Sequence, residues 1–298
     1  MTRRGTMTTR TRNLTFISNR LSRFWSKCAL LVVAVATGTS AQAGSLLILT
    51  ESVTGGLGSK EALYIASIPH TPVLCDLTCW NAKNTAADFN IYAAIVVGDP
   101  TCTFTAPIFD ANTTAAMAAA VTGNVSIWGT DPTFHFTQGG DKVIKAGIDF
   151  ALSGSGTGAY ITTSCYYDSA AANTPVPMLD AFGAFTAQGA QCWNDSLIVA
   201  TSSALTGLTN TDVSNWSCSA HNFFNSFPTN FIPLVIAEGV PGGAFTTTDG
   251  AHTGGVYVLA RGARPLFAPA VSEWGLGALA LLLLTGVAFK FSRRRVTA

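Results

Sequence analysis

The sequence has 298 residues, of which 48% are hydrophobic and 11% are charged, and its formal net charge is +1. So little charge excludes a disordered polyelectrolyte, and a conventional nucleic-acid binder is excluded because it needs a basic surface. The positive charge lies at the two ends: residues 44–271 hold 6 basic and 15 acidic residues, a net charge of −9. The middle of the chain is therefore an acidic domain, and nucleic acid is not an expected partner.

The N-terminal segment has the organisation of a secretory signal peptide. A basic region ends at Lys27, an apolar run covers residues 28–36, and Ala41-Gln42-Ala43 follows. This order predicts cleavage after Ala43, with an uncleaved membrane anchor as the alternative. We expect residues 1–43 to be read by the secretion translocon and signal peptidase, and the mature chain to be exported.

The C-terminal segment is predicted to cross a membrane. Residues 274–289 are almost wholly apolar, and Lys290 and three consecutive arginines follow them. With its flanking residues, a helix here approaches the thickness of the hydrocarbon layer, and the basic tail places the C-terminus in the cytoplasm. We expect residues 265–298 to form a hinge, a sorting motif, one transmembrane helix that anchors the chain in the inner membrane, and a basic tail.

The residues just before this helix resemble a known sorting signal. An Ser-Glu-Trp-Gly core, an apolar helix and an arginine cluster follow one another here as in the IPTL-CTERM signal of Gram-negative bacteria. The matching positions are Pro269, Ser272, Glu273, Trp274 and Gly275. The resemblance covers residues 268–295 and implies an exosortase-like sorting protease as a partner. It also implies removal of the tail and delivery to the cell surface or the extracellular space.

Between the two targeting segments, seven apolar runs predict strands at residues 45–50, 92–98, 125–129, 159–164, 196–200, 233–237 and 255–260. Nearly continuous apolar runs suit a sheet that is covered on both faces. Helices are predicted between them at 113–121, 142–152 and 221–227, with Asp141 as the cap of the second. Residues 44–264 are therefore predicted to be an exported α/β domain: a layered, mostly parallel sheet with flanking helices. A β-sandwich is the alternative.

The mature chain keeps an even number of cysteines, because Cys28 leaves with the signal peptide. The six are Cys75, Cys79, Cys102, Cys165, Cys192 and Cys218. In an exported protein they predict up to three disulfides, whose connectivity the sequence leaves open. Cys75 and Cys79 are close enough in sequence for a local bridge. Neither a metal site nor a cofactor is expected, since no second cysteine pair has the ligand spacing of a zinc site.

Cys165 and His221 follow an order with a known parallel. Cys165 comes directly after a predicted strand, and His221 comes later in the chain. Over residues 45–262 this order resembles class I glutamine amidotransferase-like domains, which are flavodoxin-like. The resemblance implies that Cys165 is a nucleophile in a tight turn and that His221 activates it. The chain lacks the glycines that flank this turn in the family, and Phe223 stands where the family has a glutamate, so the resemblance is to a degenerate member.

One further group of residues is a candidate metal site. His135 and His221, with Asp99 or Asp131, offer metal ligands at the carboxyl ends of predicted strands, but isolated histidines are more often hydrogen-bonded structural residues.

The function we expect is that of an exported, sorted envelope or surface protein whose domain binds a ligand or is structural, and is not an enzyme. The alternative is a cysteine-dependent hydrolase or amidase that uses Cys165 and His221. An adhesin-like β-sandwich is a third hypothesis.

Overall fold

The computed structural model describes residues 44–102 and 105–262. The predicted signal peptide, sorting motif, transmembrane helix and basic tail lie outside these residues. Within the described ranges, no helix is both long enough and apolar enough to cross a membrane.

The described part consists of strands and helices that alternate through its first half and of strands joined by loops and short helices through its second. The strands are β1 (Ser45–Leu49), β2 (Thr71–Cys75), β3 (Tyr92–Val97), β4 (Val125–Trp128), β5 (Gly158–Thr162), β6 (Thr174–Pro175), β7 (Thr186–Trp193), β8 (Ser196–Ile198), β9 (Ala220–Ser226), β10 (Ile232–Glu238), β11 (Phe245–Thr246) and β12 (Thr253–Arg261). The α-helices are α2 (Lys60–Ser67), α3 (Leu77–Asn81), α4 (Ala86–Asn90), α5 (Ala111–Ala120), α6 (Gly140–Leu152) and α7 (Asn210–Val213).

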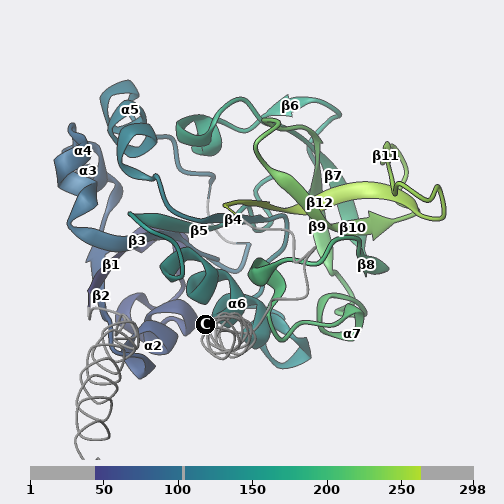
Figure 1. The fold of residues 1–298 in the computed structure, drawn as a ribbon, viewed down its shortest axis with the longest axis horizontal. Coiled ribbons are helices and arrows are strands. Elements are labelled where there is room, and N and C mark those ends of the chain that lie inside the picture. The colour runs from purple at the N-terminus through teal and green to yellow at the C-terminus, as the bar shows by residue number, and fades with distance from the viewer. Residues whose placement is uncertain (1–43, 103–104, 263–298) are drawn as a thin grey trace, which may run out of the picture. The chain divides into compact units, whose positions relative to one another are not determined.

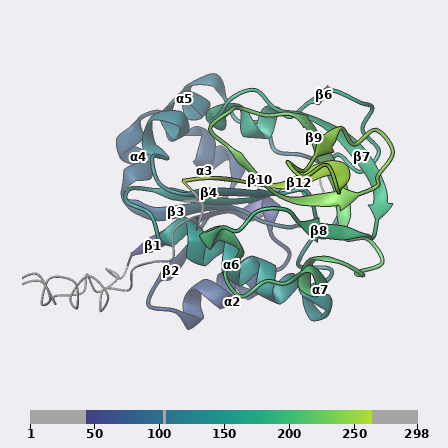
Figure 2. The same cartoon turned by 45° about the vertical axis from the view of Figure 1, so that its right-hand side comes forward.

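All twelve strands belong to one mixed sheet. Strands β2, β1, β3, β5 and β4 lie side by side in that order and are parallel, and we call them the parallel half. Strand β12 then pairs antiparallel with β4, and the strands beyond it, β6 to β11, form with it the antiparallel half. The predicted α/β class is confirmed, but the sheet is mixed where a mostly parallel one was expected. The alternative of a β-sandwich is wrong for the described residues, since helices cover both faces of the single sheet (Figure 1, Figure 2).

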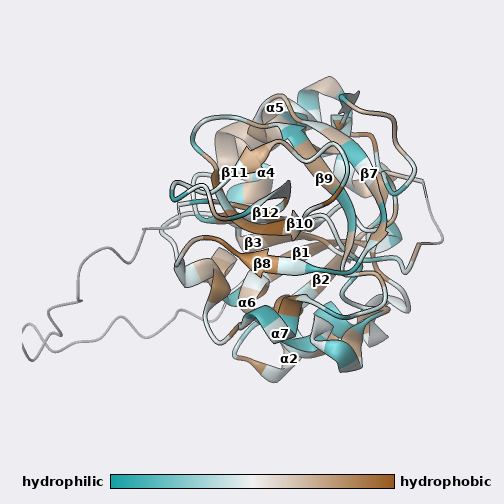
Figure 3. Cartoon of the chain, turned by 90° about the vertical axis from the view of Figure 1, so that its right-hand side faces the viewer, coloured by the Kyte–Doolittle hydropathy of each residue, from teal (hydrophilic) through white to brown (hydrophobic). Residues whose placement is uncertain are grey.

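Two apolar layers sandwich the sheet. Successive residues of β1 point to opposite faces: Leu46 and Ile48 pack in a core that includes residues of α2 and α6, whereas Leu47 and Leu49 pack with residues of α3 to α5. All four leucine and isoleucine side chains are completely buried. Figure 3 shows apolar residues concentrated in the central strands and hydrophilic ones on outer helices such as α2 and α7. A strand buried on both faces reads as an uninterrupted apolar run, which explains why the sequence revealed these strands.

The seven predicted strands are confirmed, as are the predicted helices at 113–121 and 142–152, which correspond to α5 and α6. Helix α6 begins at Gly140 with Gly139 as its N-cap, so the prediction that Asp141 caps it is wrong: Asp141 lies in the first turn.

The helix predicted at 221–227 is strand β9, which pairs with β7 and β12. Phe223 and Phe224 pack in the two different core layers, on opposite faces of the sheet. Only the twofold period of a strand places consecutive side chains in this way, and aromatic residues favour strands.

Candidate functional site

Polar side chains gather at the carboxyl edge of the parallel half. Ser52 follows β1, Asp99 follows β3, Asp131 follows β4, and Cys165 follows β5. Because these strands are parallel and adjacent, the residues after them meet at one edge of the sheet, where α/β proteins commonly bind ligands. The topology therefore assembles a candidate site from segments that are far apart in the sequence.

His221 reaches this edge from the antiparallel half. It lies at the start of β9, and the backbone N–H groups of His221 and Asn222 both donate to the carbonyl oxygen of Gly129, at 2.9 and 3.2 Å. The Thr163 hydroxyl, just after β5, donates to Asn222 Oδ1 at 2.6 Å. These bonds tie the start of β9 to the ends of β4 and β5. At Gly129 the approach is so close that a Cβ atom would lie 2.3 Å from the carbonyl oxygen of Asn222.

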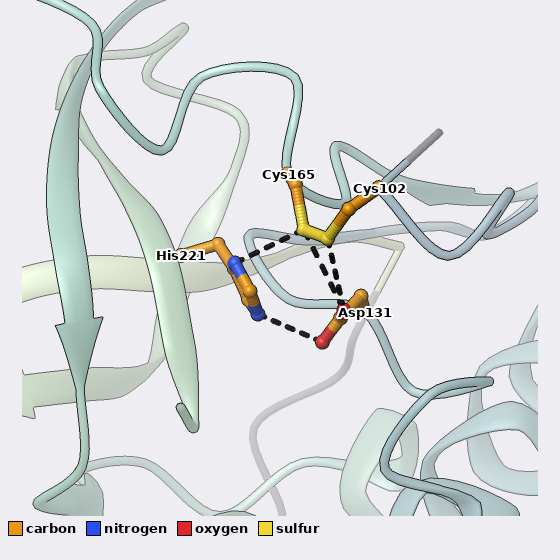
Figure 4. A group of neighbouring side chains, drawn as sticks. All are labelled: Cys102, Asp131, Cys165 and His221. Carbon is orange, nitrogen blue, oxygen red and sulfur yellow. Dashed lines mark hydrogen bonds and ion pairs between the residues drawn. A yellow bond between two sulfur atoms is a disulfide. The ribbon is translucent and has the colours of Figure 1, made fainter. Parts of the chain in front are cut away.

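The structure brings the two predicted catalytic residues together and adds a third. Cys165 Sγ lies 3.2 Å from His221 Nδ1, and His221 Nε2 lies 2.8 Å from Asp131 Oδ1 (Figure 4). His221 and Asp131 are buried, with 4% and 1% of their surfaces exposed. A sulfur, an imidazole and a carboxylate in this order are the parts of an activated thiol nucleophile. The sequence interpretation considered Asp131 only as a metal ligand, since its position after a strand was the one signal available.

The six cysteines of the described residues stand at disulfide distance in three pairs. Their Cα atoms are 5.4 Å apart in Cys75–Cys79, 4.8 Å in Cys102–Cys165 and 4.1 Å in Cys192–Cys218. The first pair is the local bridge that the sequence suggested. In the second pair, Cys165 meets Cys102 beside His221 (Figure 4). A sulfur bonded to another sulfur is no nucleophile, so this pairing decides whether the Cys165–His221–Asp131 group can act as one.

The tight turn after β5 is centred on Ser164. Its φ is +43°, in the left-handed region that residues other than glycine rarely adopt. The completely buried Ser164 hydroxyl donates to Asp99 Oδ1 at 2.8 Å, which holds the turn. The resemblance to amidotransferase-like domains implies a tight turn at Cys165. In this chain the left-handed residue is Ser164, one position earlier.

Two buried carboxyl groups lie beneath the site. Glu61 Oε1 accepts hydrogen bonds from the Thr133 hydroxyl at 3.0 Å and from the N–H of Asp99 at 3.2 Å. Burial raises the pKa of Glu61 to about 7, and the nearby charge of Asp99 adds to this. Burial also raises the pKa of Asp99 to about 6, with a contribution from the charge of Asp131. Close, desolvated carboxyl groups cannot all carry charge, so they hold protons toward neutral pH.

Metal donors meet at the same place. The structure brings His135 to the site as well: its Nε2 lies 3.3 Å from Asp131 Oδ1, so one carboxylate oxygen faces two imidazoles. Two groups of four donors lie within 4.8 Å, and both contain His221. They are Cys102, Asp131, Cys165 and His221, and Asp168, Cys192, Cys218 and His221. Both depend on cysteine thiolates, so neither could hold a metal ion with its sulfurs paired.

A pocket opens beside the site. It has a volume of about 350 Å³ and is lined by Leu49, Glu51, Ile108 and Tyr166, among others. Tyr166 is the residue directly after Cys165. The remaining histidines have other partners: His70 contacts the backbone of Gly44, and His252 pairs with Glu238.

Comparisons of the chain with protein-family models, with curated proteins and with solved structures yield no match.

Proposed function

We propose that this protein is exported and sorted to the bacterial envelope, and that residues 44–264 act there as an oxidised, non-catalytic α/β domain that binds a ligand or serves a structural role. The proposal combines the two targeting segments read from the sequence with the state of the cysteines in the structure. It includes an inner-membrane anchor before processing and release of the tail by an exosortase-like protease.

The observation that carries the proposal is the complete pairing of the cysteines. All six cysteines of the mature chain fall into three pairs at disulfide distance, and none is left over. Such a set suits a compartment in which disulfides form and persist, outside the cytoplasm. The pairing also occupies Cys165, the one sulfur that the site would use as a nucleophile. A domain of this kind can bind a ligand, but its Cys165 sulfur cannot attack a substrate while it is bonded to Cys102.

The pocket at the carboxyl edge supports a ligand-binding role. Leu49, Leu77 and Ile108 give it a largely apolar wall, with the carboxylate of Glu51 on the same wall. Pockets that bind small molecules combine an apolar lining with a few polar groups in this way. Its position beyond the ends of parallel strands is also the usual one for α/β proteins.

Mass spectrometry of the exported protein tests this proposal. The intact mass and a peptide map made without reduction, after alkylation of free thiols, give both mature termini and the state of each cysteine. We expect an N-terminus at Gly44, a C-terminus near Val271, and a peptide that joins Cys102 to Cys165. A Cys102→Ala variant is the matched control, since it must leave Cys165 open to alkylation. A retained signal peptide, or a Cys165 that alkylates in the unreduced wild-type protein, would contradict the proposal.

A second candidate function is a thiol-dependent hydrolase or amidase. The observation that favours it is the chain of contacts from Cys165 through His221 to the buried Asp131. Reduction would free Cys165 beside a base that a carboxylate orients. We would assay the reduced protein on small thioester, ester and amide substrates, with Cys165→Ala and Cys79→Ala as paired variants. Hydrolysis that disappears only in Cys165→Ala supports this function, and equal rates in both variants exclude it.

A further inference from the structure

Two of the cysteine pairs share one arrangement around His221. In each pair one cysteine is exposed, namely Cys102 or Cys192, and its partner lies further inside. The inner sulfurs, Cys165 Sγ and Cys218 Sγ, lie 3.2 and 3.5 Å from the same atom, His221 Nδ1. One imidazole nitrogen therefore contacts the sulfur of the less exposed cysteine of each pair, while the other cysteine of each pair is exposed. The Cys102 sulfur also lies 3.2 Å from Asp131 Oδ2.

This arrangement determines which sulfur of each pair a thiolate attacks and which sulfur leaves. In thiol–disulfide exchange, an incoming thiolate attacks the accessible sulfur, and the reaction is faster when the departing sulfur is a good leaving group. A sulfur beside a protonated imidazole is such a leaving group, because its developing negative charge is stabilised and it can take up a proton. Asp131 Oδ1 at 2.8 Å from Nε2 and Asp168 Oδ1 at 3.7 Å from Nδ1 would balance the charge of that ring.

We propose that the Cys102–Cys165 pair is a thiol–disulfide exchange site, in which external thiols attack Cys102 and Cys165 leaves toward His221. The reductant it takes is a small dithiol or a protein dithiol. This inference rests on the part of the proposed function that pairs Cys102 with Cys165, and it adds an activity that the pairing alone does not imply.

The reaction balances as two exchanges. A thiolate of the dithiol attacks Cys102 Sγ, a sulfur–sulfur bond forms, and the Cys102–Cys165 bond breaks with its electron pair on Cys165, which takes a proton from His221. The second thiol of the dithiol then attacks the external sulfur of the mixed disulfide and releases Cys102 as a thiolate. The two protons that the dithiol loses pass to the solvent, and the solvent returns one to His221 and one to the Cys102 thiolate. In sum, the protein pair is reduced by two electrons to two thiols, and the dithiol is oxidised to a disulfide.

The pair Cys75–Cys79 provides a comparison within the same molecule. It also joins a buried cysteine, Cys75, to an exposed one, Cys79. In the described part of the chain, however, no histidine lies within hydrogen-bond distance of either sulfur. Exposure alone would make the three pairs similar, whereas the proposed role of His221 makes two of them different from the third.

The experiment measures the reduction rate of each pair separately. The exported, folded protein is mixed with limiting dithiothreitol, quenched at intervals with an alkylating reagent, and mapped by mass spectrometry. We expect Cys102–Cys165 to be reduced faster than Cys75–Cys79, and His221→Asn to slow it at least about tenfold, as for the loss of a general acid. The Cys75–Cys79 rate is expected to stay unchanged in that variant. His252→Asn is the matched control, because it removes a histidine that pairs with Glu238.

A monothiol tests the direction of attack. With glutathione in place of the dithiol, the mixed disulfide is expected on Cys102 and a free thiol on Cys165. An adduct mainly on Cys165, or a Cys102–Cys165 rate that His221→Asn leaves unchanged, would overturn the proposal. If the unreduced protein lacks the Cys102–Cys165 peptide altogether, the pairing in the proposed function has failed. If the peptide is present but resists exchange as Cys75–Cys79 does, only this inference fails.

Discussion

The parallel and antiparallel halves of the sheet contribute different chemistry to one site. The parallel half supplies the carboxyl groups of Asp99 and Asp131 and the sulfurs of Cys102 and Cys165, all in segments that follow its strands. The antiparallel half supplies His221, through β9. The contact chain from Cys165 through His221 to Asp131 therefore takes members from both halves. The seam between β4 and the antiparallel strands is therefore where the candidate function is assembled.

The halves also differ in how they are stabilised. The parallel half buries its strands between two helical layers and holds ionisable groups beneath the site, with Glu61 and Asp99 completely buried. The antiparallel half meets it through a close backbone approach at Gly129. Four kinds of perturbation should therefore affect the two halves differently: removing a disulfide, neutralising a buried carboxyl group, forcing apart the strands at Gly129, and removing a surface ion pair.

The largest effect is expected on removing the link between the loops after β3 and β5. The Cys102–Cys165 pair spans 63 residues and Cys75–Cys79 spans 4. A cross-link stabilises more when it closes a longer loop, so Cys102→Ala/Cys165→Ala should lower the free energy of unfolding by about 4 kcal/mol and Cys75→Ala/Cys79→Ala by about 2 kcal/mol. Urea unfolding of both double variants measures this difference. Equal losses would show that the cross-links do not act through loop entropy.

The next effect concerns the buried Glu61. Its pKa is raised from 4.5 to about 7 by burial, so between these pH values the folded protein holds a proton that the unfolded chain has released. The free energy of unfolding should therefore fall as the pH rises through this window, by on the order of 3 kcal/mol, and then level off.

Glu61→Gln tests this slope with a neutral side chain that can keep accepting from Thr133 and from the backbone of Asp99. We expect the variant to match the wild type at pH 4 and to be more stable than it at pH 8. The slope that remains is that of Asp99, whose pKa is raised to about 6. Urea midpoints across this pH range provide the measurement. If Glu61→Gln is less stable than the wild type at pH 8, Glu61 is charged in the folded protein and its interactions stabilise the fold.

A smaller loss is expected from prising the seam apart. In Gly129→Ala the new Cβ would lie 2.3 Å from the carbonyl oxygen of Asn222, so β9 and β4 must separate. We expect a loss of about 2 kcal/mol, in line with other overpacked positions. Gly58→Ala is the control glycine, since no atom lies within 4 Å of its added Cβ. Gly129→Ala should also slow the reduction of the Cys102–Cys165 pair by a dithiol, because His221 moves with β9. If the free energy of unfolding of Gly129→Ala equals that of the wild type, the strands at Gly129 can separate without loss of stability.

The smallest effect is expected at a surface contact between α6, which packs on the parallel half, and α7, which lies in the chain between β8 and β9 of the antiparallel half. Lys142 on α6 pairs with Asp212 on α7, and half of the lysine side chain is exposed. Solvent and salt screen such a pair, so Lys142→Met should leave the urea midpoint almost unchanged. A clear destabilisation that 0.5 M salt removes would instead assign this ion pair a real part in joining the two halves.

Most strands of the parallel half could be predicted from the sequence, because each of them appears as a short apolar run. The residues of β1, β3, β4 and β5 are mostly apolar and mostly buried, since helices cover both faces, and each run ends near a polar residue of the site. Strand β7 has no such run: Thr186–Trp193 mixes small, polar and aromatic residues, and its identity depends on pairing with β6 and β9. The prediction of a helix at 221–227 was wrong for the same reason. Phe223 and Phe224 pack on opposite faces of the sheet, and this can be seen only once the strands are paired.

The sequence by itself identified two residues of the site and predicted targeting segments at the two ends of the chain. It named Cys165, His221 and the six cysteines, because these residue types carry distinctive chemistry wherever they stand. Only the tertiary structure decided which of them meet. The pairing of Cys102 with Cys165, the placement of Asp131 against His221, and the shared contact of two sulfurs with one imidazole nitrogen join residues up to 90 positions apart. Such contacts are set by the order and direction of the strands, which no local pattern of residues encodes.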